Sequence, residues 1–168
     1  IQGFLIAFSA IALMMCLLLG SARTGFLAMV PNLVPILLTL GAMGWLDIPL
    51  DYAKAGIAAV AMGIAVDDTI HLVLRFRHEF LACGSYSEAL NRSLQEVGRA
   101  LVITSIALTA GFLVLLLSVL DSQAIQGLLL SVTIVTALVA DFLLMPALIL
   151  TFKPFGPEKA DPENTSQA

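Results

Sequence analysis

Two adjacent carboxylates, Asp67 and Asp68, lie inside an otherwise apolar run that extends from residue 53 to about residue 76. An ionised side chain at the centre of a bilayer costs about 2.5 to 3.5 kcal/mol on translocon-insertion scales, so ionisable residues in such runs usually handle protons or ions. Two neighbouring carboxyls in a medium of low dielectric constant favour the protonated state of at least one of them near neutral pH. The pair predicts proton coupling, with a purely structural role in fixing helix register as the alternative.

A helix over this run would place further polar residues beside the pair, since side chains recur at about 100° per residue. His71 and Arg75 share the face of the two carboxylates, and His78 continues it. His71 is suited to pass protons because imidazole titrates near physiological pH, although a hydrogen-bonded structural histidine fits the position equally well. Gly56 and Gly63 on the same face would let another helix approach closely, so we predict that this face packs against a helix.

Two later apolar runs supply candidate hydrogen-bond partners for the acidic pair. Asp141 is a third carboxylate within an apolar run, and both a coupling role and a structural role are open for it. Hydroxyl groups in membrane helices often bond back to the preceding turn, so each hydroxyl candidate has that structural alternative. The hydroxyl candidates are Thr104, Ser105, Thr109 and Thr136.

The same carboxylates also suggest a metal site or an intramembrane aspartyl protease. One helix face that carries Asp67, Asp68 and His71 supplies too few converging ligands for a metal, so we predict neither a metal nor a cofactor. A protease would pair Asp67 with Asp141 on facing helices, but the sequence around Asp67 is not the Gly-x-Gly-Asp pattern of such enzymes. Because Asp68 would have no role in a protease, we expect that the chain is not an enzyme.

The composition requires a membrane environment for these residues. Hydrophobic residues make up 60% of the 168, charged residues 12%, and the mean hydropathy is +1.01, all far from the averages of soluble domains. Five apolar runs are long enough to cross about 30 Å of hydrocarbon as helices, and none alternates as the strands of a membrane barrel do. They cover residues 4–20, 25–45, 53–76, 100–120 and 124–152. The predicted fold is all-α, a polytopic membrane bundle of five transmembrane helices.

Two segments lie outside the predicted spans. Polar and apolar residues alternate at helical spacing over about 86–98, which predicts one amphipathic helix on the cytoplasmic surface. Residues 153–168 are polar and rich in proline, so we predict a disordered cytoplasmic tail after a bundle that occupies 1–152.

Basic residues near the span ends predict the orientation. One side has only Lys54, and the other carries Arg23, Arg75, Arg77, Arg92, Arg99, Lys153 and Lys159. The positive-inside rule therefore puts the C-terminus in the cytoplasm and the N-terminus outside. A chain that begins outside at Ile1, with neither an initiator Met nor a charged signal region, is expected to be the C-terminal part of a longer protein.

Several sequence stretches together resemble a known family. GIAVDDTIH at 63–71, RFRHE at 75–79 and VGRA at 97–100 resemble the C-terminal membrane half of the resistance-nodulation-division (RND) superfamily. Within it the chain is most similar to the MMPL-type exporters, relatives of Patched, Dispatched and the sterol-sensing domains. PNLVP at 31–35 and LMPAL at 144–148 fit the same pattern, and the resemblance covers nearly the whole chain up to about residue 152.

The resemblance implies spans eight to twelve of a twelve-span transporter that is built from two similar halves and driven by proton antiport. Asp67 and Asp68 take the positions of the intramembrane carboxylates of that family. The multidrug pumps also carry an intramembrane Lys near the acidic pair. Since no predicted span here has one away from its ends, coupling would need carboxylates of the other half.

The implied location is the bacterial inner membrane, and the expected partners follow from it. They are the N-terminal half of the same polypeptide, membrane lipid, protons and a hydrophobic substrate such as a drug, lipid or hopanoid. A homo-oligomer is open, and no nucleic acid is expected as a partner. The alternative function is a sterol- or lipid-sensing module that does not transport, and such a module would tolerate loss of the acidic pair.

Overall fold

The computed structural model describes residues 2–48 and 52–158, and all regular structure in these residues is helical. A π-helical turn, Leu94–Gly98, joins α4 to α5, and a 3-10 turn, Val114–Leu117, follows α5. The helices are α1 (Gln2–Leu19), α2 (Ala22–Trp45), α3 (Tyr52–Cys83), α4 (Tyr86–Ser93), α5 (Arg99–Leu113) and α6 (Asp121–Phe152). The all-α prediction is therefore confirmed.

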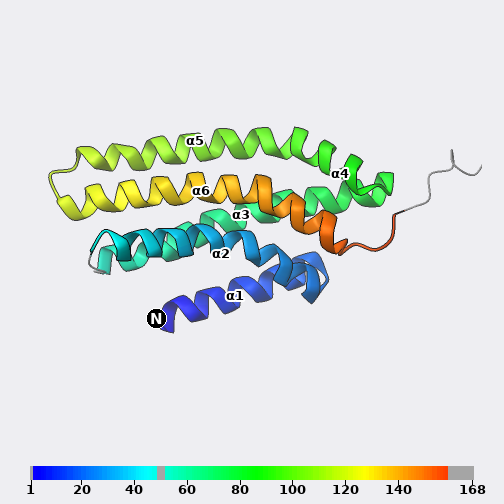
Figure 1. Ribbon diagram of the computed structural model, residues 1–168, viewed down its shortest axis with the longest axis horizontal. Helices are drawn as coiled ribbons and strands as arrows, with labels where there is room; N and C mark the ends of the chain where they lie inside the picture. The colour runs from blue at the N-terminus through cyan, green and yellow to red at the C-terminus, as the bar shows by residue number, and fades with distance from the viewer. Residues whose placement is uncertain (1, 49–51, 159–168) are drawn as a thin grey trace, which may run out of the picture.

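The long helices lie side by side along one axis (Figure 1). α6 is central to the bundle, because it packs against α2, α3 and α5. α5 covers α6 on one side, and α1 packs mainly against α2 on the other. α3, which carries the acidic pair, packs against both α2 and α6.

Three stretches of helix in the described residues are long and apolar enough to cross a membrane. They are Ala22–Trp45, Tyr86–Leu117 and Asp121–Phe152, and a shorter apolar stretch covers Phe8–Leu19. Each of the five predicted spans coincides with a helix, and these three stretches make the chain a multi-pass membrane protein. That α1 and α3 also cross the membrane stays a prediction.

The segment predicted as a surface helix over about 86–98 is helical, and it continues without a break into α5. The uninterrupted stretch runs from residue 86 to residue 117, with the π-helical turn inside it. The sequence changes from amphipathic to apolar along this stretch, and the environment of the helix changes with it. Because no proline interrupts the stretch, its backbone stays helical throughout.

Two glycines allow neighbouring helices to pack closely. A Cβ on Gly25 would lie 2.6 Å from the Cys16 sulfur, where α2 meets α1. A Cβ on Gly127 would lie 2.5 Å from the Phe112 carbonyl oxygen, where α6 meets α5. Both distances are too short for a side chain, so each helical hairpin depends on its glycine.

The first residues of the predicted disordered tail pack against the bundle. The Tyr86 hydroxyl donates to the carbonyl oxygen of Gly156 at 3.0 Å and accepts from the N–H of Phe155 at 3.0 Å. The Phe155 ring lies 5.5 Å from that of Phe76, between ring centroids. An aromatic anchor thus holds residues 153–158 against the bundle. The predicted disorder of the tail stays a prediction, and residues 159–168 lie outside the described residues.

Candidate functional site

The acidic pair lines a groove between α3 and α5. The groove has a volume of about 670 Å³, and its other walls are mainly apolar residues of α5 and the π-helical turn. The Asp67 side chain is 73% exposed, Asp68 is half-buried, and both open onto this space. His71, one turn further along α3, brings its Nε2 to 3.6 Å from the Asp67 carboxylate. The pair and the histidine predicted to act with it therefore share one groove.

An ion-pair network closes one end of this groove. Arg75 pairs with Glu79, 2.6 Å from Nη2 to Oε1, and with Glu96 across the gap between α3 and the π-helical turn. Glu96 also lines the groove. Sequence reasoning missed Glu96, because its place in an amphipathic segment is typical of a solvent-facing charge. The available signal was its position next to the VGRA stretch at 97–100.

The inner face of α3 holds a second polar cluster that the sequence did not predict. The Thr69 hydroxyl lies 2.7 Å from the Asp141 Oδ1 atom on α6 and 3.0 Å from the Asn32 Oδ1 atom on α2. All three side chains are buried, and Asp141 Oδ2 has no hydrogen-bond partner. Asp141 therefore bonds Thr69 in this structure, and its role as a partner of the acidic pair stays a prediction.

The four predicted hydroxyls make no hydrogen bond to the acidic pair within residues 2–48 and 52–158. Thr104 lines the groove but donates to the Ala100 carbonyl at 3.1 Å, and Thr136 donates to the carbonyl one turn before it. Ser105 and Thr109 line a crevice of about 270 Å³ between α5 and α6, and their hydroxyls have no partner. Their role as partners of the pair stays a prediction.

Gly56 and Gly63, predicted to pack against a helix, face open space. Within the described part of the chain, no heavy atom lies within 4 Å of a Cβ built on either residue. No helix of the described residues therefore uses them for close packing, and their predicted role stays a prediction.

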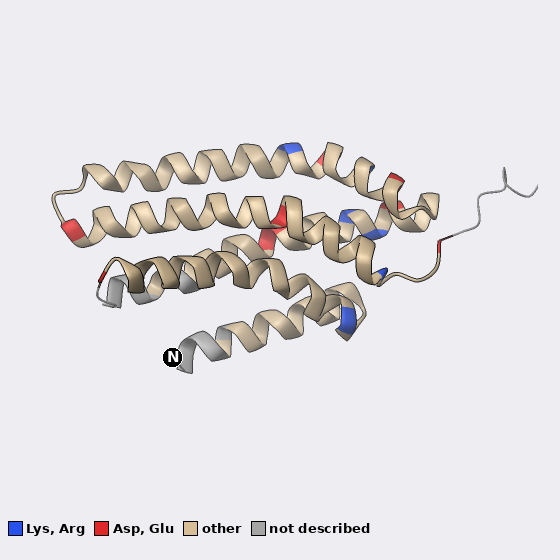
Figure 2. Cartoon of the chain, in the orientation of Figure 1, with Lys and Arg blue, Asp and Glu red and all other residues tan. Residues whose placement is uncertain are grey.

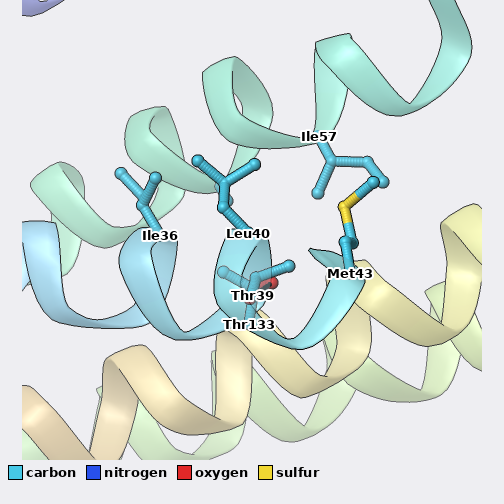
Figure 3. Close-up of a pocket in the computed structure, with 7 residues that line it drawn as sticks. Ile36, Thr39, Leu40, Met43, Ile57 and Thr133 are labelled. Carbon is cyan, nitrogen blue, oxygen red and sulfur yellow. Dashed lines mark hydrogen bonds between the residues drawn. The ribbon is translucent and has the colours of Figure 1, made fainter. Parts of the chain in front are cut away.

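A second, much smaller cavity lies between α2, α3 and α6. Figure 3 shows Ile36, Leu40 and Met43 of α2 around it, with Thr39 beside Thr133. The cavity has a volume of about 10 Å³, and the two threonine hydroxyls are 2.6 Å apart and satisfy each other. About one water molecule would fit, so this cavity does not hold a substrate.

Charges are distributed unevenly over the bundle. Figure 2 shows acidic residues in the middle of α3 and α6, and basic residues toward the end of the bundle at which α3 ends. At that end Arg77 donates to the Leu19 carbonyl at 3.2 Å. The described residues contain no cluster of three or more His, Cys, Asp or Glu that could hold a metal ion.

Comparison with known proteins gives one family and two relatives. The sequence profile of the MMPL family matches residues 3–167. A Methanocaldococcus jannaschii protein named "Putative membrane protein MJ1562" is 35% identical over 127 residues, which are 76% of this chain and 33% of the relative. A Streptomyces coelicolor protein named "Putative membrane protein ActII-3" is 30% identical over 96 residues, 57% of this chain and 14% of the relative. The chain thus spans about one third of the first relative's length and less of the second's. No solved structure matches the chain.

Proposed function

Because the chain belongs to the MMPL family, we propose that it is the C-terminal membrane part of a proton-driven exporter of hydrophobic or lipid-like substrates. Asp67 and Asp68 would couple proton movement to a change in helix packing. The observation that carries this proposal is the opening of both carboxylates onto a mainly apolar groove. Ionised carboxylates are costly at such a place, and those that occur in membrane helices usually mark proton or ion pathways.

The arrangement of the groove supports a route for protons along α3. Asp67 is followed one turn later by His71, and Arg75 with Glu96 stands at the end of the groove. By the positive-inside rule, the end of the bundle that is rich in arginine faces the cytoplasm. Protons would enter from outside, neutralise the pair, and leave through His71 toward that end.

Protonation of the pair would drive movement because it removes the charge that keeps the groove hydrated. One proton that crosses 100 mV supplies about 2.3 kcal/mol, which biases a two-state equilibrium by more than tenfold. The face with Gly56 and Gly63 is open in the described residues. We propose that another segment of the complete polypeptide packs there and rocks against this bundle.

The decisive test replaces the acidic pair. Asp67→Asn and Asp68→Asn, singly and together, are expected to reduce proton-coupled transport at least about tenfold, because the coupling energy of a proton is lost. The measurement uses the complete polypeptide in proteoliposomes with an imposed pH gradient, a pH-sensitive dye, and a fluorescent phospholipid analogue as cargo.

The matched control for this test is Glu88→Gln, which neutralises an exposed carboxylate of α4 whose ion pair within residues 2–48 and 52–158 is with Arg92 at 2.5 Å. Exposed ion pairs of this kind contribute little to the free energy of folding, so transport and thermal stability should be unchanged. Proton-dependent transport that persists in the double Asn variant would contradict the proposed function.

A lipid-sensing module that does not transport is the second candidate. It is favoured by an apolar crevice of about 430 Å³ between α5 and α6, whose lining includes Thr109, Ser131 and Thr136. Such a module would bind lipid with unchanged affinity after the acidic pair is replaced. Lipid binding by the double Asn variant, measured without a pH gradient, separates the two functions.

A further inference from the structure

The buried cluster of Asn32, Thr69 and Asp141 joins three helices in the middle of the bundle. Asn32 is 2%, Thr69 0% and Asp141 1% exposed, so none of the three reaches the groove. Thr69 follows Asp68 directly on α3 but points to the opposite side, toward α2 and α6. The cluster is therefore a site of its own, separate from the acidic pair.

The hydrogen atoms available at this cluster are too few if Asp141 is ionised. Three oxygens surround the Thr69 hydroxyl: Asp141 Oδ1 at 2.7 Å, Asn32 Oδ1 at 3.0 Å and the Ala65 carbonyl at 3.0 Å. The Asn32 amide group donates to the Ala28 carbonyl at 3.0 Å and has no hydrogen directed at Thr69. A hydroxyl carries one hydrogen, so Thr69 can donate to only one of the two side-chain oxygens, and its contact with the other would bring two acceptors together without a donor.

One added proton resolves this shortage. A protonated Asp141 donates through Oδ1 to the Thr69 hydroxyl, and Thr69 then donates its own hydrogen to Asn32 Oδ1. The Ala65 carbonyl needs no further donor, because it lies inside α3 and accepts the backbone hydrogen bond of the helix. Each of the three side chains then has a partner, and no charge remains in the apolar interior.

The oxygen of Asp141 that has no hydrogen-bond partner also indicates a protonated carboxyl. Asp141 Oδ2 is buried and has no hydrogen bond. A carboxylate spreads its negative charge over both oxygens, so an unbonded buried oxygen would carry charge with nothing to stabilise it. The carbonyl oxygen of a neutral acid loses much less in that place.

We propose that Asp141, Thr69 and Asn32 form a proton-binding site, and that Asp141 holds its proton while α2, α3 and α6 are packed as in this structure. The bound proton forms an O–H bond with the Asp141 carboxylate. Release breaks this bond and passes the proton to water, which requires that α2 or α6 separate from α3. The proposal concerns where a proton binds, so it does not depend on the cargo or direction of transport.

One charge acts on this site from a neighbouring element. Asp68 on α3 interacts electrostatically with Asp141, and two like charges across one helix repel each other. The other ionisable groups of α3 near this level, Asp67 and His71, line the groove on the far side. Arg23 and Arg99 lie in the first turns of α2 and α5, and Asp121 is the first residue of α6.

Infrared spectroscopy of the complete polypeptide in lipid nanodiscs, labelled with carbon-13 at the aspartate carboxyl, tests this site. We expect a carbonyl band of a neutral, buried aspartic acid that persists at pH 7 and exchanges slowly in D₂O. Asp141→Asn should remove this band. Thr69→Val should shift it, because the acceptor of the acid proton is lost, whereas Thr69→Ser should leave it near its original position.

Each outcome decides the proposal. Loss of the band in Asp141→Asn, or its shift in Thr69→Val if the Asn variant does not fold, supports the site. An unchanged neutral-acid spectrum in both variants, or no such band at pH 7, overturns it. Asp67→Asn should retain the band, so a failure here is distinct from a failure of the transport test on the acidic pair.

Discussion

Tyr86 holds residues 155–158 against the bundle through its side chain and its backbone. Its hydroxyl donates to Gly156 and accepts from Phe155, each at 3.0 Å, and its own N–H donates to Glu158 at 3.0 Å. Its ring packs against Phe80, with 4.3 Å between ring centroids. The side chain is almost fully buried, so it forms a fixed anchor for residues 153–158.

Removal of this hydroxyl should release the anchored segment. Tyr86→Phe removes the two hydrogen bonds to the Phe155 N–H and the Gly156 carbonyl, and a hydrogen bond contributes about 0.5 to 1.5 kcal/mol to stability. Hydrogen exchange of the backbone amides of Phe155, Gly156 and Glu158 is expected to accelerate about fivefold or more. Ser87→Ala, at an exposed position of α4, is the control and should not change it. Equal exchange in both variants would mean that the hydroxyl contributes nothing.

At the residue scale, the sequence predicts carboxylates within the apolar runs better than it predicts the hydroxyl and amide groups that bond to them. Asp67 and Asp68 are identified by the cost of placing a carboxylate in an apolar run. Thr69 and Asn32 carry no comparable signal, because a single hydroxyl or amide is common in membrane helices. Their bonds join residues 37 and 72 positions apart, so they follow from helix packing and not from local pattern.

At the element scale, α5 and α6 form a hairpin that depends on Gly127. Gly127→Ala would place a methyl group 2.5 Å from the Phe112 carbonyl oxygen, which is backbone and cannot move aside without shifting α5. Such overpacking typically costs about 1 to 3 kcal/mol. The expected result is a lower midpoint of thermal unfolding in detergent.

Gly111→Ala in α5 is the matched control. A Cβ there would meet no heavy atom within 4 Å in the described residues, and alanine is favoured over glycine in a helix by about 0.5 to 1 kcal/mol. This variant should therefore be as stable as the unmodified protein or slightly more stable. If the two variants have the same midpoint, close packing at Gly127 does not stabilise the hairpin.

The sequence predicts the positions of the helices well and their continuity poorly. Runs of apolar residues locate all five long helices, because length and hydropathy are properties of the sequence itself. The join between α4 and α5 depends on backbone hydrogen bonds through the π-helical turn. Composition changes at this point while the backbone stays helical, so a pattern of side chains predicts two elements where the structure has one.

On the scale of the whole molecule, Glu158 links the segment after α6 to the start of α4. The N–H of Tyr86 and the Lys153 ammonium, both at 3.0 Å, lower the pKa of the Glu158 carboxyl below its ordinary value of 4.5. A carboxyl with a lowered pKa adds stability above its unfolded pKa and loses it as the pH falls through the folded value. The anchored segment should therefore loosen below about pH 4.5.

This pH dependence can be measured by limited proteolysis of the anchored segment, residues 153–158, at several pH values with an acid-active protease. Cleavage should increase as the pH falls below 4.5 in the unmodified protein. Glu158→Gln removes the titrating group, so its cleavage should depend less on pH over the same range. If acidification increases the cleavage of both proteins equally, Glu158 is not the group that causes the pH dependence.

The unbroken helix from residue 86 to residue 117 has a mechanical consequence. Its α5 portion forms one wall of the groove, and its α4 portion lies beside the end of α3 and the anchored segment. Because the backbone is helical without interruption through the π-helical turn, widening of the groove along α5 is expected to displace α4 as well. A spin label at an exposed α4 position would therefore report the width of the groove without touching it.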